Sequence, residues 1–334
     1  MNIYKLISLN RIITNHRIKF FGIYLLHKLN KRYLAVNIDP VLACNLRCKM
    51  CYFTDEDYVK NNKGQFLLKD LKLVADRIFD RALKLQIGCG TEPTLYKNLP
   101  ELVRLGKAHH VPYISLTTNA NLLNHDKIEE LLDAGLNEFT ISLHGVTKDS
   151  YEGFMQNASY EKFMDVFQIL KRLKKEREFK VRINYTFNKD NFYELSTFFE
   201  HFDGDSFDIL QIRPIQNLGN TDYQDFDITS LIDDYPKLIS NIRKECRKFG
   251  ITLMVPNKLE TLKQTNKSSY IFDYTFCYIS PNKFWKDGFD WRNETFNQFS
   301  ERINWSHSLL KNVFKSNEQM SSTSKRLNYE IEFN

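Results

Sequence analysis

Residues 44–52 read CNLRCKMCY, which places three of the six cysteines of this 334-residue chain within eight positions. Thiolates at Cys44, Cys48 and Cys51 can ligate one small metal centre from a single loop. A structural zinc ion would need a fourth ligand nearby, and the next cysteine along the chain is Cys89. The spacing therefore predicts a 4Fe–4S cluster that leaves one iron open for a cofactor or a substrate.

A non-catalytic metal-binding protein is the alternative, either an electron carrier or an interaction domain stabilised by zinc. The remaining cysteines, at 89, 246 and 277, are scattered, so a disulfide framework is a poor explanation in a chain of this length. We therefore expect a reducing, cytoplasmic location. No stretch approaches 18 uninterrupted apolar residues, and no membrane-spanning helix is predicted.

The cysteine loop follows a predicted strand, and the chain beyond it alternates between short β-rich runs and longer helical ones. Strands are predicted at residues 33–39, 84–88, 112–117, 137–143, 180–187, 207–213 and 251–255. Helices are predicted at residues 67–83, 99–110, 125–134, 160–177, 191–202 and 230–249. Strand–helix alternation with crossovers of this length is typical of a parallel sheet.

The predicted strands carry polar residues along one face and apolar residues along the other. Parallel strands covered on both faces usually read as continuous apolar runs, and a close-packed barrel would have branched apolar residues inside. We therefore predict an α/β barrel or open barrel whose interior binds a polar ligand. The residues expected to point inward are Tyr113, Ser115, Thr117, Asn119, Glu138, Thr140, Ser142, His144, Arg182, Asn184 and Thr186.

The cysteine spacing, the aromatic Tyr52 and the position after the first strand resemble the radical S-adenosylmethionine (SAM) superfamily. The resemblance covers about residues 34–255 and implies a partial (β/α)6 barrel, followed here by a C-terminal extension. It also implies that the open iron of the cluster binds SAM. One-electron cleavage then gives methionine and a 5′-deoxyadenosyl radical, which abstracts hydrogen from a substrate. Such an enzyme, an oxidoreductase or a transferase, needs a low-potential electron donor of the flavodoxin or ferredoxin type.

Two strand ends resemble elements of this family that bind SAM. The sequence GCGTEP at 88–93 resembles its Gly-Gly-Glu-Pro element, so the resemblance assigns Gly90 and Glu92 to the amino group of SAM. Physically, Gly90 lets backbone approach a ligand closely, and a carboxylate can accept hydrogen bonds from an ammonium group. Thr91 departs from the pattern. The sequence TTN at 117–119 resembles the Thr-Asn-Gly element and assigns Asn119, with Ala120 in place of glycine.

Further candidates lie on the next strands. The sequence SLHG at 142–145 resembles the element that contacts the ribose or carboxylate of SAM, with His144 in place of the usual acid. Ser142 is therefore assigned to SAM, while His144 contacts SAM, donates to substrate or is a strand-end histidine. Arg182 and Asn184, with Arg213 on the sixth strand, lie on the polar face. A guanidinium suits a carboxylate, and an internal salt bridge is the alternative for each arginine.

Two cysteines outside the loop carry further predictions. Alternation places Cys89 with Leu85 and Ile87 on the helix-facing side, so we predict a buried core cysteine. Cys277 resembles the entry to the SPASM-type extension of radical SAM maturases, but residues 278–334 contain no cysteine for an auxiliary cluster. A peptide- or protein-modifying maturase is therefore one expectation. The missing cysteines favour the other, which is a small-molecule, sugar or lipid-linked substrate.

The charge of the chain is concentrated at its start. Residues 1–32 contain seven basic and no acidic residues, whereas residues 33–334 contain 40 basic and 41 acidic ones. This distribution argues against a nucleic-acid-binding surface. An amphipathic segment of this kind lies on an anionic membrane at the inner face of the cell, plugs the barrel, or directs the chain to an organelle. We thus divide the chain into the basic segment 1–32, the barrel 33–255 and the extension 256–334.

Overall fold

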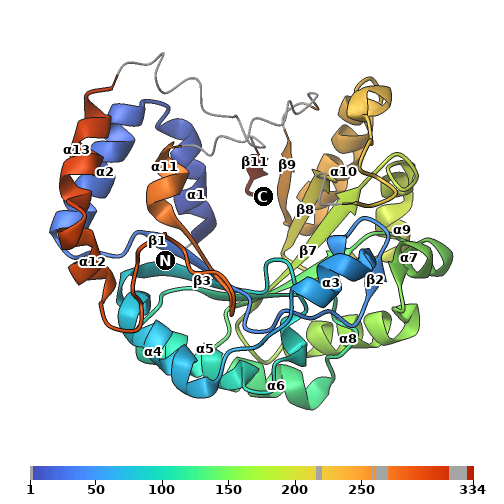
Figure 1. Ribbon diagram of the computed structural model, residues 1–334. Helices are drawn as coiled ribbons and strands as arrows, with labels where there is room; N and C mark the ends of the chain where they lie inside the picture. The colour runs from blue at the N-terminus through green and yellow to red at the C-terminus, as the bar shows by residue number, and fades with distance from the viewer. Residues whose placement is uncertain (1–2, 216–219, 257–258, 260–269, 316–328) are drawn as a thin grey trace.

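The computed structural model describes residues 3–215, 220–256, 259, 270–315 and 329–334. Within them a curved, mostly parallel sheet is surrounded by helices on its convex side (Figure 1). The sheet has nine strands in the order β10-β1-β3-β4-β5-β7-β8-β9-β11. The strands are β1 (Leu34–Ile38), β3 (Ala82–Ile87), β4 (Ile114–Thr118), β5 (Glu138–Leu143), β7 (Lys180–Phe187), β8 (Ile209–Pro214), β9 (Thr252–Pro256), β10 (Phe276–Ile279) and β11 (Tyr329–Glu332).

The helices that cover the sheet lie between consecutive strands, as a parallel arrangement requires. They are α4 (Leu68–Ile78), α5 (Leu99–Ala108), α6 (His125–Asp133), α8 (Tyr160–Leu173), α9 (Phe198–His201) and α10 (Tyr235–Phe249). Two short helices, α3 (Glu56–Asn61) and α7 (Lys148–Phe154), and a two-stranded sheet of β2 (Arg47–Cys48) and β6 (Met155–Gln156) lie beside the cysteine loop. All seven predicted strands are present, and the predicted partial barrel is confirmed.

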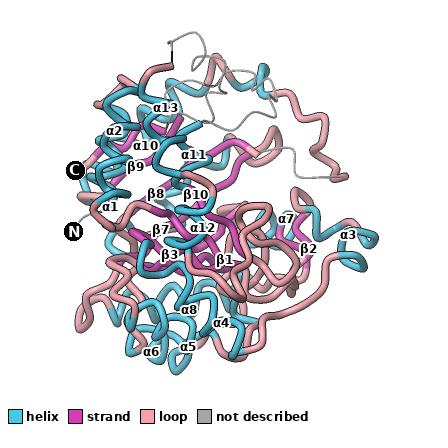
Figure 2. The backbone as a smooth tube through the Cα atoms, turned by 60° about the vertical axis from the view of Figure 1, so that its left-hand side comes forward, coloured by secondary structure: helices cyan, strands magenta, loops and turns pink. Residues whose placement is uncertain are grey.

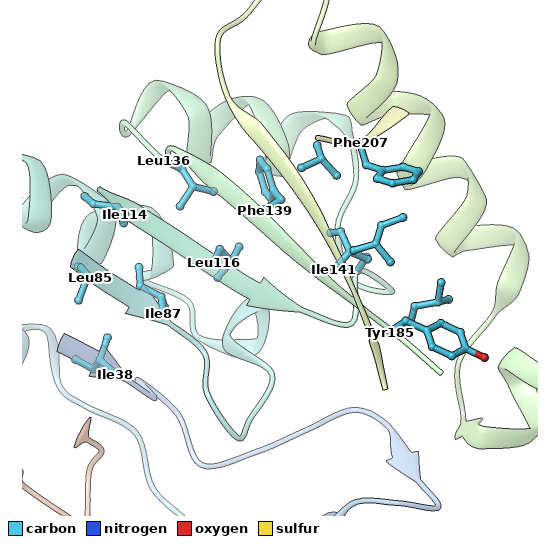
Figure 3. Packing of buried hydrophobic residues seen from close by; sticks show 14 of the residues in the cluster. Ile38, Leu85, Ile87, Ile114, Leu116, Leu136, Phe139, Ile141, Tyr185 and Phe207 are labelled. Carbon is cyan, nitrogen blue, oxygen red and sulfur yellow. The ribbon is translucent and has the colours of Figure 1, made fainter. Parts of the chain in front are cut away.

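The apolar face of each strand packs against the helices, as the period-2 pattern predicts. Figure 3 shows these side chains in one continuous layer on neighbouring strands. Each is almost completely buried, and burying such a side chain typically stabilises a fold by about 1.5–3 kcal/mol. Members of the layer are Ile38, Leu85, Ile87, Ile114, Leu116, Phe139, Ile141 and Tyr185.

Several predicted helices are shorter than their patterns, among them those predicted at 67–83 and 191–202. The helix predicted at 67–83 ends at Ile78, because Ala82 already pairs with Leu34 as the first residue of β3. The helix predicted at 191–202 is a 3₁₀ helix, Tyr193–Thr197, followed by the single turn α9. Its buried residues recur at every third position, a spacing that a 3₁₀ helix satisfies as well as an α-helix does.

The C-terminal part of the chain adds a strand to each edge of the sheet. Strand β10 pairs in parallel with β1, and β11 pairs antiparallel with β9. Helix α11 (Tyr270–Thr275), just before β10, and helices α12 (Phe296–Arg302) and α13 (Trp305–Val313), between β10 and β11, contribute to a cluster of aromatic side chains. Trp305 packs edge-on against Phe296, and its indole Nε1 donates to the Tyr33 hydroxyl at 3.1 Å.

The basic N-terminal segment forms two helices, α1 (Ile3–Ile12) and α2 (His16–Lys28). Helix α1 packs into the sheet, where Ile3 and Tyr4 are buried with Ile209 and Met254. The Tyr4 hydroxyl donates to the Glu138 carboxylate. Helix α2 packs along α13 on the outside (Figures 1 and 2). Of the helices described, none has the length and apolar character needed to cross a membrane.

A buried ion pair joins two strands inside the barrel. The Arg182 Nη2 lies 3.0 Å from Glu138 Oε1, and both side chains are almost fully enclosed. Glu138 also accepts hydrogen bonds from the hydroxyls of Tyr113 at 2.6 Å and Thr140 at 2.8 Å. Burial alone would raise the pKa of Glu138, but Arg182 and Lys84 outweigh it and hold this pKa below its usual range.

We predict that Glu138→Gln lowers the free energy of unfolding by about 3–5 kcal/mol at neutral pH, because it leaves the Arg182 guanidinium buried without its counter-charge. A carboxyl with a depressed pKa stabilises the fold above its unfolded-state pKa and loses this contribution as the pH falls through its folded-state pKa. The difference between the two proteins in urea unfolding should therefore shrink in acid. Glu161→Gln, which removes the exposed pair with Lys148, should leave the midpoint unchanged.

Candidate active site

The three loop cysteines line a single cavity of about 370 Å³ at the carboxyl ends of the parallel strands. Cys48 belongs to β2, which pairs antiparallel with β6. The Cys51 amide donates to the Cys48 carbonyl at 2.8 Å, and the Leu46 amide donates to the Cys44 sulfur at 3.4 Å. These backbone contacts turn the loop so that the thiols of Cys44, Cys48 and Cys51, which are four and three residues apart, reach the same cavity.

The electrostatics of the loop favour a bound cationic centre. Burial raises the pKa of Cys44 to about 11, and it raises the pKa of Cys48 well above its usual value. The neighbouring thiols Cys51 and Cys44 raise the pKa of Cys48 further. Thiolate ligands in such a place are stable when a metal centre supplies positive charge.

The three thiols are suited to a cluster bound by three cysteines. Structural zinc takes four ligands, whereas three cysteines, each on a different iron, can hold a 4Fe–4S cluster with one iron left open. Within the described ranges, no group of three His, Cys, Asp or Glu side chains is placed to hold a single metal ion.

The loop that connects β3 to the following 3₁₀ helix is held by Asp39, a fully buried carboxylate at the end of β1. Asp39 accepts from the Cys89 amide at 2.7 Å, the Gly90 amide at 3.2 Å and the Thr91 hydroxyl at 3.0 Å. The Tyr278 hydroxyl of β10 also donates to Asp39, at 2.8 Å. Asp39 and Tyr278 line the cavity, and sequence reasoning missed both. Asp39 could have been found from the sequence, because it is an acidic residue that directly follows an apolar strand.

The side chain of Tyr52 lies so close to position 90 that a residue larger than glycine would not fit there. The Tyr52 hydroxyl donates to the Gly90 carbonyl at 2.6 Å, and a Cβ at position 90 would lie 2.0 Å from that hydroxyl oxygen. A larger residue would therefore push away the tyrosine that follows the last loop cysteine. Gly90 and Tyr52 thus connect the cysteine loop to the loop that follows β3.

The prediction for Cys89 is wrong. Its side chain is exposed and lines the cavity instead of packing with Leu85 and Ile87. Gly88 adopts a φ of +82°, which ends the strand alternation one residue earlier. The Cys89 thiol faces the Asn37 side chain, with its sulfur 3.7 Å from Oδ1. Burial among the surrounding atoms nonetheless raises the pKa of this thiol well above its usual value.

Glu92 lies on the opposite side of the same loop, 2% exposed, among hydrogen-bond donors. Its Oε1 accepts from the Thr94 amide at 3.1 Å and from the Thr118 hydroxyl at 2.8 Å. Its Oε2 accepts from the Asn119 amide at 2.8 Å. Burial raises the pKa of Glu92, although these hydrogen bonds act in the opposite direction. One protein donor at Oε2 leaves that oxygen able to accept from a ligand in the cavity.

The other cavity-lining candidates come from the ends of β4, β5, β7 and β8. The cavity wall includes Asn119, Ser142, His144, Asn184 and Arg213. Asn119 holds the cysteine loop, since its Nδ2 donates to the Asn45 side chain at 2.9 Å. Among the described residues, the buried atoms His144 Nδ1 and Asn184 Oδ1 have no protein partner. Buried polar atoms are normally paired, so both are suited to a polar ligand.

Two neighbouring groups set the charge of this wall. Burial and, to a smaller extent, the nearby Arg213 lower the pKa of His144 to about 4. The imidazole is therefore neutral at neutral pH. Arg213 donates from Nε to the Thr186 hydroxyl at 3.2 Å and contributes a cationic side chain to the cavity lining.

Arg182 does not reach the cavity. It lies deeper in the barrel, paired with Glu138, and its Nη2 donates to the Thr140 hydroxyl at 2.8 Å. The polar-face assignment placed it on the correct side of the strand. It occupies a lower layer of the barrel interior than Asn184, which lies two residues further along β7.

The comparisons with known proteins agree with this geometry. Residues 38–195 match the family model of the radical SAM superfamily. The chain is also 30% identical to a probable GTP 3′,8-cyclase of Saccharolobus solfataricus over 62% of its length. Part of this chain, residues 38–195, is therefore similar to the radical SAM superfamily. A second relative, the probable GTP 3′,8-cyclase of Metallosphaera sedula, is 24% identical over 72% of this chain and 71% of its own length.

Solved radical SAM structures share the fold. SuiB of Streptococcus suis bound to S-adenosylmethionine has a TM-score of 0.57 at 18% identity, covering 81% of this chain and 64% of SuiB. Native anSMEcpe with bound AdoMet has a TM-score of 0.58 at 17% identity, covering 86% of each chain. The chain spans 65% of the length of the first curated relatives, just under two thirds. The family model agrees with the predicted family and with its predicted cofactors, a 4Fe–4S cluster and SAM.

Proposed function

We propose that this chain is a radical SAM enzyme that removes a hydrogen atom from a small polar substrate bound in the barrel beside SAM. When bound, the reduced cluster supplies the electron that cleaves SAM to methionine and the 5′-deoxyadenosyl radical used for hydrogen abstraction. The observation that carries this proposal is one cavity that contains three cluster-type thiols, the Glu92 carboxylate and unpartnered polar atoms at the strand ends.

The proposed roles follow from the contacts of each residue. Cys44, Cys48 and Cys51 would each ligate one iron. Glu92 would accept from the amino group of SAM through Oε2, and Gly90 would let the ligand approach the backbone of the same loop. Asp39 would keep this loop in place through its three contacts to residues 89–91.

The opposite wall would bind the rest of the cofactor. Arg213 is suited to its carboxylate, because a guanidinium pairs with carboxylates in a fixed geometry. Asn119, Ser142 and Asn184 would bind ribose hydroxyls or the carboxylate. The neutral His144 presents Nδ1 to the same space and would bind either SAM or substrate. Arg182 is left out of this set, since Glu138 occupies it.

A small polar substrate is favoured by the relatives and by the barrel interior. The curated relatives are named for a reaction on GTP, a polar small molecule. The similarity to SuiB bound to its precursor peptide, at 15% identity, concerns the fold alone. Cys277 is fully buried in β10, and residues 278–334 contain no other cysteine, so this extension offers no set of ligands for an auxiliary cluster. Sugars stay within the proposed class.

The electron donor we propose is of the low-potential flavodoxin or ferredoxin type. A second hollow, lined by residues 41–44 with Arg47 and Lys63, lies on the other side of Cys44. Its basic side chains would complement an acidic carrier that delivers an electron close to the cluster.

Anaerobic reconstitution tests the proposed function. The protein should bind about four irons per chain and, with dithionite and SAM, release 5′-deoxyadenosine. Adding purine nucleotides and other small polar compounds in turn should increase that rate for the substrate class. A protein that retains tightly bound zinc and does not turn over SAM would contradict the proposal. An increase with peptides alone would favour the maturase alternative.

A further inference from the structure

Helix α2 has two apolar faces on opposite sides. The inner face packs on α13 and the core, with Phe20 fully buried and His27 nearly so. On the other side Ile18, Phe21 and Leu25, continued by the C-cap residue Leu29, recur at spacings of three and four. These four residues, which we call the outer stripe, are 58%, 47%, 42% and 65% exposed.

The outer stripe is held in a fixed direction by the packing of the inner face. The Phe20 ring packs edge-on against Tyr274 of α11, with centroids 5.7 Å apart. The His27 ring lies within hydrogen-bond distance of the Tyr33 hydroxyl, at 3.1 Å, and its Nδ1 lies 3.3 Å from an Arg81 nitrogen. An ordinary surface helix would present polar residues on the side that faces away from the core. The stripe therefore has the character of a contact surface.

The surroundings of the outer stripe are positively charged. Arg17, Lys28 and Lys31 are exposed beside it, and residues 1–32 contain no acidic residue. The neighbouring helix α13 continues this character, because residues 305–315 contain Lys311 and Lys315 and no acid. Phe314, which directly follows α13, is 76% exposed. Figure 2 brings α2 and α13 forward together, so the two helices form one side of the molecule.

The exposed apolar side chains and the positive charge around them indicate which of two partners would bind the outer stripe. A second copy of the chain would place like charges opposite each other in a symmetric contact, which is unfavourable. An anionic lipid surface instead offers phosphate groups to the basic side chains and an apolar boundary to the stripe. The rest of the chain is nearly neutral, with 40 basic and 41 acidic residues after position 32, so attraction to such a surface would orient the molecule.

We propose that the outer stripe of α2 binds the surface of an anionic phospholipid bilayer. The side chains of Phe21, Leu25 and Leu29 enter the boundary between headgroups and acyl chains, while Arg17 and Lys28 contact lipid phosphates. The helix lies in the plane of the surface, because its inner face stays packed on α13. This inference does not depend on the reaction that the barrel catalyses.

Co-sedimentation of the full chain with vesicles tests the inference. The protein should bind vesicles of equal parts phosphatidylcholine and phosphatidylglycerol much more strongly than vesicles of phosphatidylcholine alone. Arg17→Gln with Lys28→Gln should weaken binding about fivefold for each charge removed, and added salt should do the same. Phe21→Glu with Leu25→Glu should weaken it more than tenfold. All four positions are exposed, so the variants should melt as the parent protein does.

Leu67→Glu provides the matched control, because Leu67 is 55% exposed at the start of α4, away from the outer stripe. Its vesicle binding should equal that of the parent protein. Equal binding to neutral and anionic vesicles would overturn the inference. So would unchanged binding by Phe21→Glu with Leu25→Glu, or a dimer in light scattering that this pair of substitutions abolishes.

Discussion

Replacing Cys48 with alanine should remove the bound iron and reduce release of 5′-deoxyadenosine below detection. Cys48 is held in β2 by pairing with β6, and its thiol interacts electrostatically with both other loop thiols. Loss of one of three ligands leaves two irons of a cluster without protein ligands, so the cluster should not persist through purification. Iron analysis and the visible absorption of the anaerobically reconstituted protein would measure the loss.

Cys246→Ala is the matched control for this experiment. Cys246 is a buried cysteine on α10 that faces the core, so its loss should leave both iron content and SAM cleavage intact. Cys89→Ala gives a second comparison within the cavity, because Cys89 belongs to the loop after β3 that is proposed to bind SAM and not to the cysteine loop. Iron retained at the parent level in the Cys48 variant would show that the metal is bound elsewhere.

Replacing Glu92 with glutamine should raise the dissociation constant of SAM by about 10- to 100-fold, which corresponds to losing a charged hydrogen bond of roughly 1.5–3 kcal/mol. The amide would also place a donor among the Thr94, Thr118 and Asn119 groups that now donate to this carboxylate. Equilibrium binding of SAM to the reconstituted protein would measure the change while iron content stays at the parent level.

Glu194→Gln is the control for the Glu92 variant. Glu194 also accepts hydrogen bonds at a strand-end loop, from the Val146 amide and the Ser150 hydroxyl, but it is not part of the cavity wall. Its replacement should leave the affinity for SAM unchanged. Unchanged affinity in the Glu92 variant would remove Glu92 from the SAM site.

The affinity of the parent protein for SAM should also depend on pH through Glu92. Burial raises the pKa of this carboxyl, and the protonated form no longer attracts the ammonium group of SAM. Affinity should therefore begin to fall at a pH above the usual titration range of glutamate, and continue to fall as the solution becomes more acidic. The Glu92→Gln protein should lack this part of the pH dependence.

The sequence could predict those site residues whose position depends only on the strand that carries them, at its carboxyl end. Carboxyl ends of parallel strands meet at one edge of a sheet, so Glu92, Asn119, Ser142 and Asn184 were brought together by topology alone. Strand β7 has the predicted bounds, 180–187, because its alternating pattern is long. The cysteine loop carried its own signal in its spacing.

The sequence could not predict contacts that depend on distant segments or on a single dihedral angle. Tyr278 reaches the cavity because β10 pairs with β1, and no local pattern specifies which edge a late strand joins. Cys89 turns toward the cavity because of the positive φ of Gly88. Arg182 was assigned to the correct face, but its depth in the barrel depends on the register with β5, where it pairs with Thr140, two residues after Glu138.

The pairing of β10 with β1 has a consequence for how the chain folds during synthesis. Strand β1 is made early and β10 late, so the hydrogen-bonding edge of β1 is unprotected until residues 276–279 emerge. Pairing between segments so far apart in sequence closes a long loop, and this slows folding. Exposed strand edges also invite pairing with other chains. Strand β10 therefore protects the edge of β1, and folding intermediates that lack this pairing are the species most prone to aggregate.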